Sequence, residues 1–141
     1  MGTLPYKMRG LSLVIIKNKG RILVSPGYDK STDESFYRIP GGGIEFGETS
    51  LEALRREIKE ELDAEIINCK LLTTIENIFT YNNEPYHELC FIYLGEFKDS
   101  SLYEKEEFKI LDSPDKGKVI WLDTNEAKDK NVYPADVKEL L

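Results

Sequence analysis

Glu57, Glu60 and Glu61 are spaced so that they would share one face of a helix. At about 100° of rotation per residue, this acidic stripe lies roughly 110° from an apolar stripe that runs from Leu51 to Leu62. Carboxylates packed this closely repel one another by a few tenths of a kcal/mol per pair. Nearby basic side chains could balance them on a solvated face, or a divalent cation could bind them. Oxygen ligands without histidine or cysteine suit Mg²⁺ or Mn²⁺ rather than zinc.

A glycine-rich loop precedes this acidic helix and favours the cation-binding alternative. Gly41, Gly42 and Gly43 allow the backbone to approach other groups closely, and Glu45 and Glu48 follow them before the helix begins. A loop that folds back along the helix can bring its two carboxylates toward the acidic stripe. The loop and the helix together therefore predict one acidic cluster.

The loop and the helix resemble the sequence signature of the Nudix hydrolase family. That signature reads Gly, five residues, Glu, seven residues, Arg-Glu, an aliphatic residue, one residue, Glu-Glu, one residue, Gly and an aliphatic residue. Two of its nine positions differ here, since Asp63 replaces the closing glycine and Ala64 replaces the bulky aliphatic residue. Asp tolerates a left-handed helix end better than most residues, so the first departure is expected to affect stability rather than chemistry. The seven matching positions are Gly42, Glu48, Arg56, Glu57, Ile58, Glu60 and Glu61.

Similarity to this family implies an α/β (α+β) protein, namely an α/β/α sandwich with a mixed β-sheet, the loop and helix of the signature, and a C-terminal helix. It implies hydrolysis of a diphosphate bond in a nucleoside di- or triphosphate derivative, with Mg²⁺ or Mn²⁺ as the cofactor. The expected partner is a small nucleotide, and the expected oligomeric state is a monomer or a homodimer. One domain is expected to cover residues 1–141.

The resemblance also implies roles for residues of the signature. Glu57, Glu60 and Glu61 would bind the metal ion, together with a backbone carbonyl such as that of Gly42. Glu57 is either a metal ligand or the base that orients the attacking water. Arg56 would hold the carboxylates of the helix and the loop in place. The expected catalytic set is therefore Glu57, Arg56 and Glu60.

Substrate contacts are expected from the loop and from the segment before it. Glu45 and Glu48 lie in the loop, where Glu48 would also support the metal cluster. Arg38 could contact phosphate or be an ordinary surface arginine. In this family the general base often lies outside the signature. The candidates for that role are Glu88, Glu107, Glu106 and Asp115.

Aromatic residues and one histidine surround a turn-prone segment in the middle of the chain. Phe79, Tyr81 and Tyr86 could stack on a nucleobase or could pack in the core. His87 is the only histidine, and it could be structural or catalytic. The sequence leaves both alternatives open for each of them.

Periodicity and turn residues outline the other elements. A helix is predicted over residues 49–62, where apolar residues recur at helical spacing and Thr49 with Glu52 has the spacing of a capping box. Turn chemistry at residues 18–20 predicts that residues 11–26 form a hairpin. Further strands are predicted at 36–39, 64–79, 87–97 and 118–122, a surface loop at 99–117, and a C-terminal helix from Pro134.

Composition and charge exclude several classes of protein. A chain of 141 residues with 40% hydrophobic content suits one domain with a single core. The 26 acidic and 19 basic residues leave a net charge of −7, which argues against general nucleic-acid binding. Apolar runs fall far short of the roughly 20 residues of a membrane helix, and no secretory signal is apparent, so a cytoplasmic protein is expected. Cys69 and Cys90 lack CxxC spacing and are expected to be free thiols.

Two other functions remain open at this point. A catalytically silent Nudix-fold module could act as a nucleotide-binding sensor, although such a module has no need for the retained glutamates. An isomerase of isoprenyl diphosphates on a related fold would want a catalytic cysteine beside the metal. Neither Cys69 nor Cys90 lies in a recognisable context for that role. The retained carboxylates favour hydrolysis.

Overall fold

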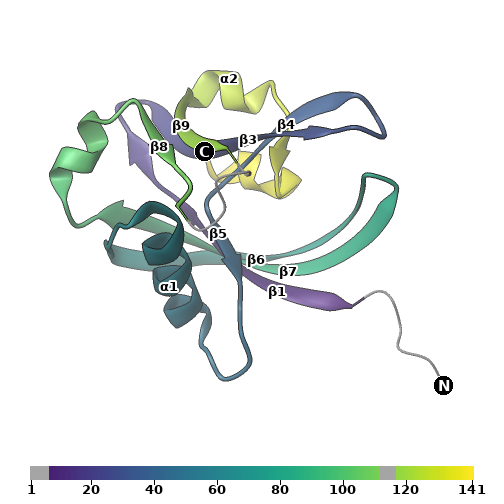
Figure 1. Ribbon diagram of the computed structural model, residues 1–141, viewed down its shortest axis with the longest axis horizontal. Helices are drawn as coiled ribbons and strands as arrows, with labels where there is room; N and C mark the ends of the chain where they lie inside the picture. Colours follow the sequence, from purple (N-terminus) through teal and green to yellow (C-terminus); the bar gives the residue numbers. More distant parts are fainter. Residues whose placement is uncertain (1–6, 112–116) are drawn as a thin grey trace.

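Two β-sheets pack against each other at the centre of the fold, and helices lie on both sides of them (Figure 1). The computed structural model describes residues 7–111 and 117–141. The first sheet is mixed, because its strand β1 pairs in parallel with β7 and antiparallel with β5. In spatial order its strands are β5 (Gly41–Gly43), β1 (Met8–Ile15), β7 (Glu84–Phe97) and β6 (Ile66–Tyr81).

The second sheet consists of short strands whose pairs are antiparallel, except that β10 pairs in parallel with β4. In spatial order its strands are β10 (Val132–Tyr133), β4 (Glu34–Arg38), β3 (Arg21–Asp29), β9 (Lys118–Asp123) and β8 (Glu107–Lys109), and β2 (Lys17–Asn18) also pairs with β3. Within the described residues, the helices are α1 (Ser50–Leu62), α2 (Thr124–Lys128) and two 3₁₀ helices, η1 (Ser100–Glu104) and η3 (Ala135–Leu140). This arrangement confirms the predicted mixed α+β class.

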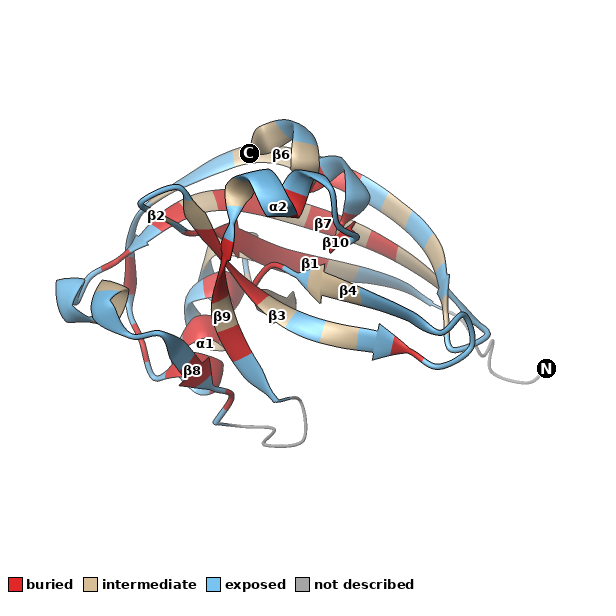
Figure 2. Cartoon of the chain, turned by 90° about the horizontal axis from the view of Figure 1, so that it is seen from above, coloured by how far each residue is buried: buried red, intermediate tan, exposed pale blue. Residues whose placement is uncertain are grey.

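Strand β1 divides the core into two clusters, because successive side chains of a strand point to opposite faces. On one face, Val14 belongs to the cluster that contains Leu54 and Ile58 of α1. On the other face, Leu13 and Ile15 belong to a cluster that includes residues of the second sheet, α2 and η3. Figure 2 shows buried residues concentrated along β1 and β7 and on part of α1. The first sheet therefore lies between α1 and the cluster that holds α2 and η3, while residues of β3, β8 and β9 complete the cluster around α1.

Helix α1 begins and ends as the sequence predicts. Thr49 is its N-cap, where Oγ1 accepts a hydrogen bond from the backbone N–H of Glu52 at 3.1 Å. The Glu52 carboxylate in turn accepts one from the backbone N–H of Thr49 at 3.0 Å, which completes the capping box. At the other end Asp63 has a φ of 51°, so the predicted left-handed cap is present.

Asp63→Gly is expected to raise the free energy of unfolding by less than about 1 kcal/mol, because glycine adopts positive φ without the steric penalty of a Cβ atom. The gain is reduced by loss of the exposed ion pair between Asp63 and Lys59, whose N–O distance is 3.0 Å. Urea denaturation measures the change, and Asp63→Asn serves as a control that removes only the charge. A clear loss of stability in Asp63→Gly would contradict this account of the cap.

The predicted hairpin over residues 11–26 is only partly correct. Its turn is present, with Lys19 at a φ of 50° and Gly20 at 78°. Strands β1 and β3, however, belong to different sheets, and only the short β2 pairs with β3. β1 is buried on both faces along its second half, which suits a central strand with neighbours on each side.

The C-terminal third departs further from the predictions. The predicted surface loop over residues 99–117 contains η1 and β8, because Phe108 is buried among charged neighbours and anchors a strand there. The predicted C-terminal helix is a short 3₁₀ helix, and α2 was not predicted. The other predicted strands are confirmed as β4, β6, β7 and β9, with the β6–β7 turn at Asn82 and Asn83.

Two smaller expectations concern the cysteines and the membrane. Cys69 and Cys90 are free thiols, as expected. Across the described ranges, no helix combines the length and the apolar character that crossing a membrane requires.

Candidate active site

The glycine strand β5 brings the backbone directly against the acidic helix. A Cβ atom on Gly42 would lie 2.5 Å from Oε2 of Glu57, so any larger residue would displace this carboxylate. Gly41 has a φ of 137°, and a Cβ atom there would lie 2.8 Å from Cα of Leu13. The glycine run thus places the backbone at Gly42 beside the Glu57 carboxylate.

Arg56 lies at the centre of the acidic cluster and joins the loop to the helix. Its Nε donates to Oε2 of Glu48 at 2.7 Å, and its Nη2 donates to Oε1 of the same carboxylate at 2.9 Å. Nη1 donates to Glu57 at 3.0 Å and to Glu60 at 3.2 Å, while Nη2 also donates to the carbonyl of Gly43 at 2.9 Å. A two-pronged arginine–carboxylate contact of this kind fixes orientation as well as distance.

The charge balance of the cluster follows from these contacts. Hydrogen bonds from Arg56 lower the pKa of Glu48 to about 2, and the same contact raises the pKa of Arg56. Both groups therefore stay charged at neutral pH. Glu45 adds a longer ion pair to Arg56 at 3.8 Å. Because one guanidinium faces four carboxylates, the cluster keeps a negative excess that a divalent cation could neutralise.

Glu48 gives the cluster a testable dependence on pH. Its folded-state pKa of about 2 lies below its ordinary value of 4.5, so its contribution to stability is complete above pH 4.5 and is lost as the pH falls toward 2. With EDTA present to remove cations, the Tm of Glu48→Gln should be lower than that of the wild type at pH 7. This difference in Tm should shrink between pH 4.5 and 2, as Glu48 of the wild type becomes protonated. A gap that persists unchanged to pH 2 would contradict this assignment.

The donor set suits a hard divalent cation. Carboxylate oxygens of Glu57 and Glu60 and the carbonyls of β5 are the ligand types that Mg²⁺ and Mn²⁺ prefer. Within residues 7–111 and 117–141, no three acidic, histidine or cysteine side chains already lie close enough to form a metal site. The glutamates are paired with Arg56 instead of gathered around one point, so cation binding would draw them together. Glu61, the third residue of the acidic stripe, is buried.

The structure brings some of the predicted site residues together and separates others. Glu107 lies outside the cluster on β8, where its carboxylate contacts Lys118 at 2.9 Å. Glu106 is exposed in the preceding segment, and Asp115 lies outside the described residues. Glu88 is buried on β7 and pairs in register with Arg9, on the face of the first sheet opposite to α1.

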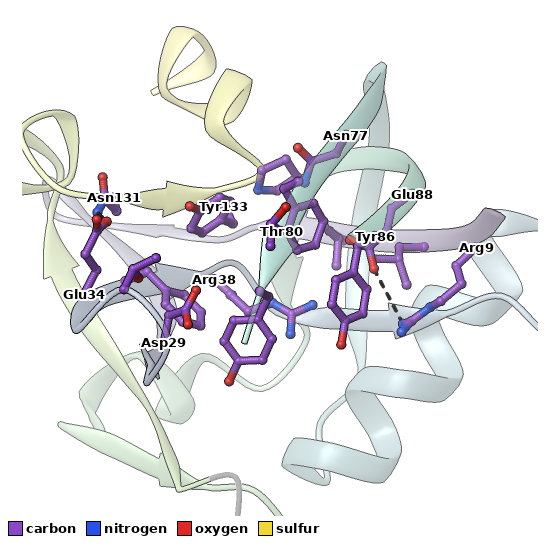
Figure 3. Close-up of a pocket in the computed structure, with 17 residues that line it drawn as sticks. Arg9, Asp29, Glu34, Arg38, Asn77, Thr80, Tyr86, Glu88, Asn131 and Tyr133 are labelled. Atoms are coloured by element: carbon purple, nitrogen blue, oxygen red, sulfur yellow. Dashed lines mark hydrogen bonds and ion pairs between the residues drawn. The ribbon is translucent and has the colours of Figure 1, made fainter. Parts of the chain in front are cut away.

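A pocket of about 250 Å³ lies between the two sheets, on the face where Glu88 is buried (Figure 3). Arg9, Glu88 and Asn77 form a row at one end, since Glu88 pairs in register with both of the others. The Arg9 and Glu88 side chains face each other, with Nη2 and Oε2 3.8 Å apart. Burial raises the pKa of Glu88, and the positive charges of Arg9 and Arg38 oppose that shift.

Aromatic side chains from both sheets form much of the pocket wall. Phe79 and Tyr86 stack at a centroid distance of 5.1 Å with their planes 9° apart. From the second sheet, Phe36 makes edge contacts with Tyr81 at 5.6 Å and with Tyr133 at 5.5 Å. Three of these five rings were predicted as candidates for base stacking, and they line the pocket. These rings offer faces and edges on which a flat ring could stack.

Several pocket residues were not predicted from the sequence. Arg9, Phe36, Asn77 and Tyr133 come from four different strands, and no motif links them. Pairing of β1, β7 and β6 is what brings the polar row together.

Strand β5 contacts the acidic cluster and also pairs with β1, which lines part of the pocket. Leu11 and Leu13 of β1 line the pocket, and both pair in register with glycines of β5. Arg38 lines the pocket at the end of β4, immediately before the two residues that lead into β5. A ligand with a ring in the pocket could therefore extend past Arg38 toward β5, where Gly42 lies against Glu57 of α1.

Fold and site together define a mixed α+β protein in which a glycine edge strand and an acidic loop lead into a capped, carboxylate-bearing helix. The family profile of the NUDIX domain matches residues 7–140. The chain therefore belongs to the Nudix family, which confirms the resemblance seen in the signature. Among solved structures, the MutT NUDIX hydrolase from Burkholderia pseudomallei has the same fold, with a TM-score of 0.62 and 22% identity over 84% of this chain and 85% of that chain.

Curated relatives are similar at low identity. The chain is 28% identical to the 8-oxo-dGTP diphosphatase of Proteus vulgaris, covering 69% of this chain and 84% of that protein. It is 30% identical to the nucleoside triphosphatase NudI of Salmonella arizonae, and the match covers 75% of this chain and 89% of that protein. It is 29% identical to the RNA pyrophosphohydrolase of Bartonella bacilliformis over 57% of this chain, and spans only 48% of that protein's length.

Proposed function

We propose that the chain hydrolyses a diphosphate bond in a nucleoside di- or triphosphate derivative, with Mg²⁺ or Mn²⁺ as the cofactor. The observation that carries this proposal is the arrangement of Glu48, Glu57 and Glu60 around Arg56, beside the glycines of β5. The relatives named for 8-oxo-dGTP, nucleoside triphosphates and RNA pyrophosphate support the same reaction class.

Glu57, Glu60 and Glu61 would hold the cation, together with a carbonyl such as that of Gly42. When bound, the cation would neutralise phosphate charge, polarise the phosphoryl group and lower the pKa of a coordinated water. Such neutralisation is needed because an acidic cluster in a chain of net charge −7 would otherwise repel a polyphosphate.

Arg56 and Glu57 have distinct tasks in this proposal. Arg56 keeps Glu48 and Glu57 in place, since its guanidinium contacts both. Among the described residues, none donates a hydrogen bond to Oε2 of Glu57, so this oxygen is available to a cation or to a proton of the attacking water. Arg38, exposed at the end of β4, would contact the phosphates.

A substrate screen tests the proposal. Nucleoside di- and triphosphates, dinucleoside polyphosphates, nucleotide sugars and 5′-triphosphorylated RNA are incubated with the protein and Mg²⁺, and released mononucleotide, pyrophosphate and phosphate are measured. Hydrolysis of at least one class at a diphosphate bond is expected. Nucleotide binding without any product would contradict the proposal and favour a sensor module instead.

A further inference from the structure

The polar row at the end of the pocket contains a carboxylate whose hydrogen-bonding capacity is unused. The Glu88 side chain is only 5% exposed, yet its one recorded polar contact is the 3.8 Å ion pair with Arg9, longer than a hydrogen bond. No group in the described part of the chain donates a hydrogen bond to this carboxylate. Because this side chain lines the pocket, its oxygens can accept hydrogen bonds from a water or a ligand that enters there.

The neighbours of Glu88 indicate the shape of that ligand. Asn77 lies directly opposite Glu88 across β6 and β7, and Phe79 and Tyr86 form the next pair along the same face. A ring lying against these aromatic side chains would present its edge to the Glu88 carboxylate and the Asn77 amide. Nucleobases are recognised in this way, by stacking on aromatic rings and by hydrogen bonds to one edge.

The chemistry of a carboxylate then selects among the bases. The Arg9 guanidinium beside Glu88 favours the ionised form of this carboxylate. In that form the group only accepts hydrogen bonds, and its two oxygens suit two adjacent N–H donors. Guanine presents such a pair, N1–H and the 2-amino group, on its Watson–Crick edge. Adenine and cytosine place a ring acceptor beside their amino group, and uracil has carbonyl groups on both sides of N3–H. A mismatched base would leave Glu88 unpaired or facing a lone pair, which a buried site rejects strongly.

We propose that Glu88, with Asn77 and Arg9 beside it, recognises the Watson–Crick edge of a guanine base, so that the preferred substrates are guanine nucleotides. This inference rests on the proposed function for its substrate class. The pocket, of about 250 Å³, is lined by the aromatic side chains and the polar row, so the base would lie there. The sugar and phosphates would lie outside, toward Arg38 and β5.

Calorimetric titration with nucleoside monophosphates in EDTA tests the inference without hydrolysis or metal. The affinity for GMP is expected to exceed that for AMP, CMP or UMP by a factor of about ten or more. It should exceed the affinity for IMP, which lacks only the 2-amino group, by a similar factor. Glu88→Gln should lose most of the preference for GMP. Glu76→Gln, an exposed glutamate on the opposite face of β6, makes the same charge change and should keep it.

Several results would overturn guanine recognition: no GMP binding at millimolar concentration, equal affinity for GMP and IMP, equal or tighter binding of another base, or an unchanged preference in a folded Glu88→Gln. If that variant does not fold, the comparison of GMP with IMP in the wild type still decides. The proposed hydrolase function and the proposed guanine recognition can be disproved independently of each other. Selective GMP binding without hydrolysis in the substrate screen contradicts the hydrolase alone, whereas hydrolysis that prefers another base contradicts guanine recognition alone.

Discussion

Glu60→Gln is expected to lower kcat by about 100-fold or more for the best substrate of the screen, because the carboxylate would hold the cation that stabilises the transition state. Its folded state should be little affected. The Glu60 side chain is 47% exposed and has one 3.2 Å contact with Arg56, and exposed ion pairs contribute little to stability.

Glu65→Gln is a matched control for this variant. Glu65 is also an exposed glutamate with a single ion pair, to Lys98 at 3.3 Å, and it lies just beyond the end of α1. Steady-state kinetics and thermal melting of both variants separate chemistry from stability. A Glu60→Gln protein that keeps full activity but melts much earlier would mean that the acidic stripe is only a solvated face balanced by basic residues.

Chelation of divalent cations is expected to abolish turnover. Four carboxylates share one guanidinium in the cluster, so a polyphosphate would meet net negative charge there when no cation is bound. Hydrolysis is followed with excess EDTA and then after Mg²⁺ or Mn²⁺ is restored in excess, which should recover the rate. Turnover at full rate in EDTA would show that the carboxylates serve another purpose.

The signature helix could be predicted because its determinants are local. The capping box of Thr49 and Glu52, the apolar spacing along α1 and the left-handed Asp63 all lie within fifteen residues. The convergence of Glu48 and Glu57 on Arg56 was expected from the same segment through the family resemblance. The catalytic and metal-binding roles of these residues stay predictions.

The pocket could not be predicted in the same way, because strand pairing assembles it. Glu88 was named as a candidate general base, a role that stays a prediction. Its place beside Arg9, on the sheet face opposite to α1, depends on strand register. The division of residues 11–26 between two sheets likewise depends on distant partners, since β1 pairs with β7 and β3 pairs with β9. The alternation of apolar and polar residues along a strand predicts which face is buried, but it does not predict which strands pair with it.

Binding of Mn²⁺ to the protein, followed by electron paramagnetic resonance of the free ion, tests most directly whether the acidic cluster is a cation site. The wild type is expected to bind Mn²⁺, with competition by Mg²⁺. Glu57→Gln and Glu60→Gln should each weaken binding by about tenfold or more, because each removes a charged oxygen ligand, whereas Glu65→Gln should bind like the wild type. Unchanged Mn²⁺ affinity in both cluster variants, or no binding by the wild type, would contradict the account.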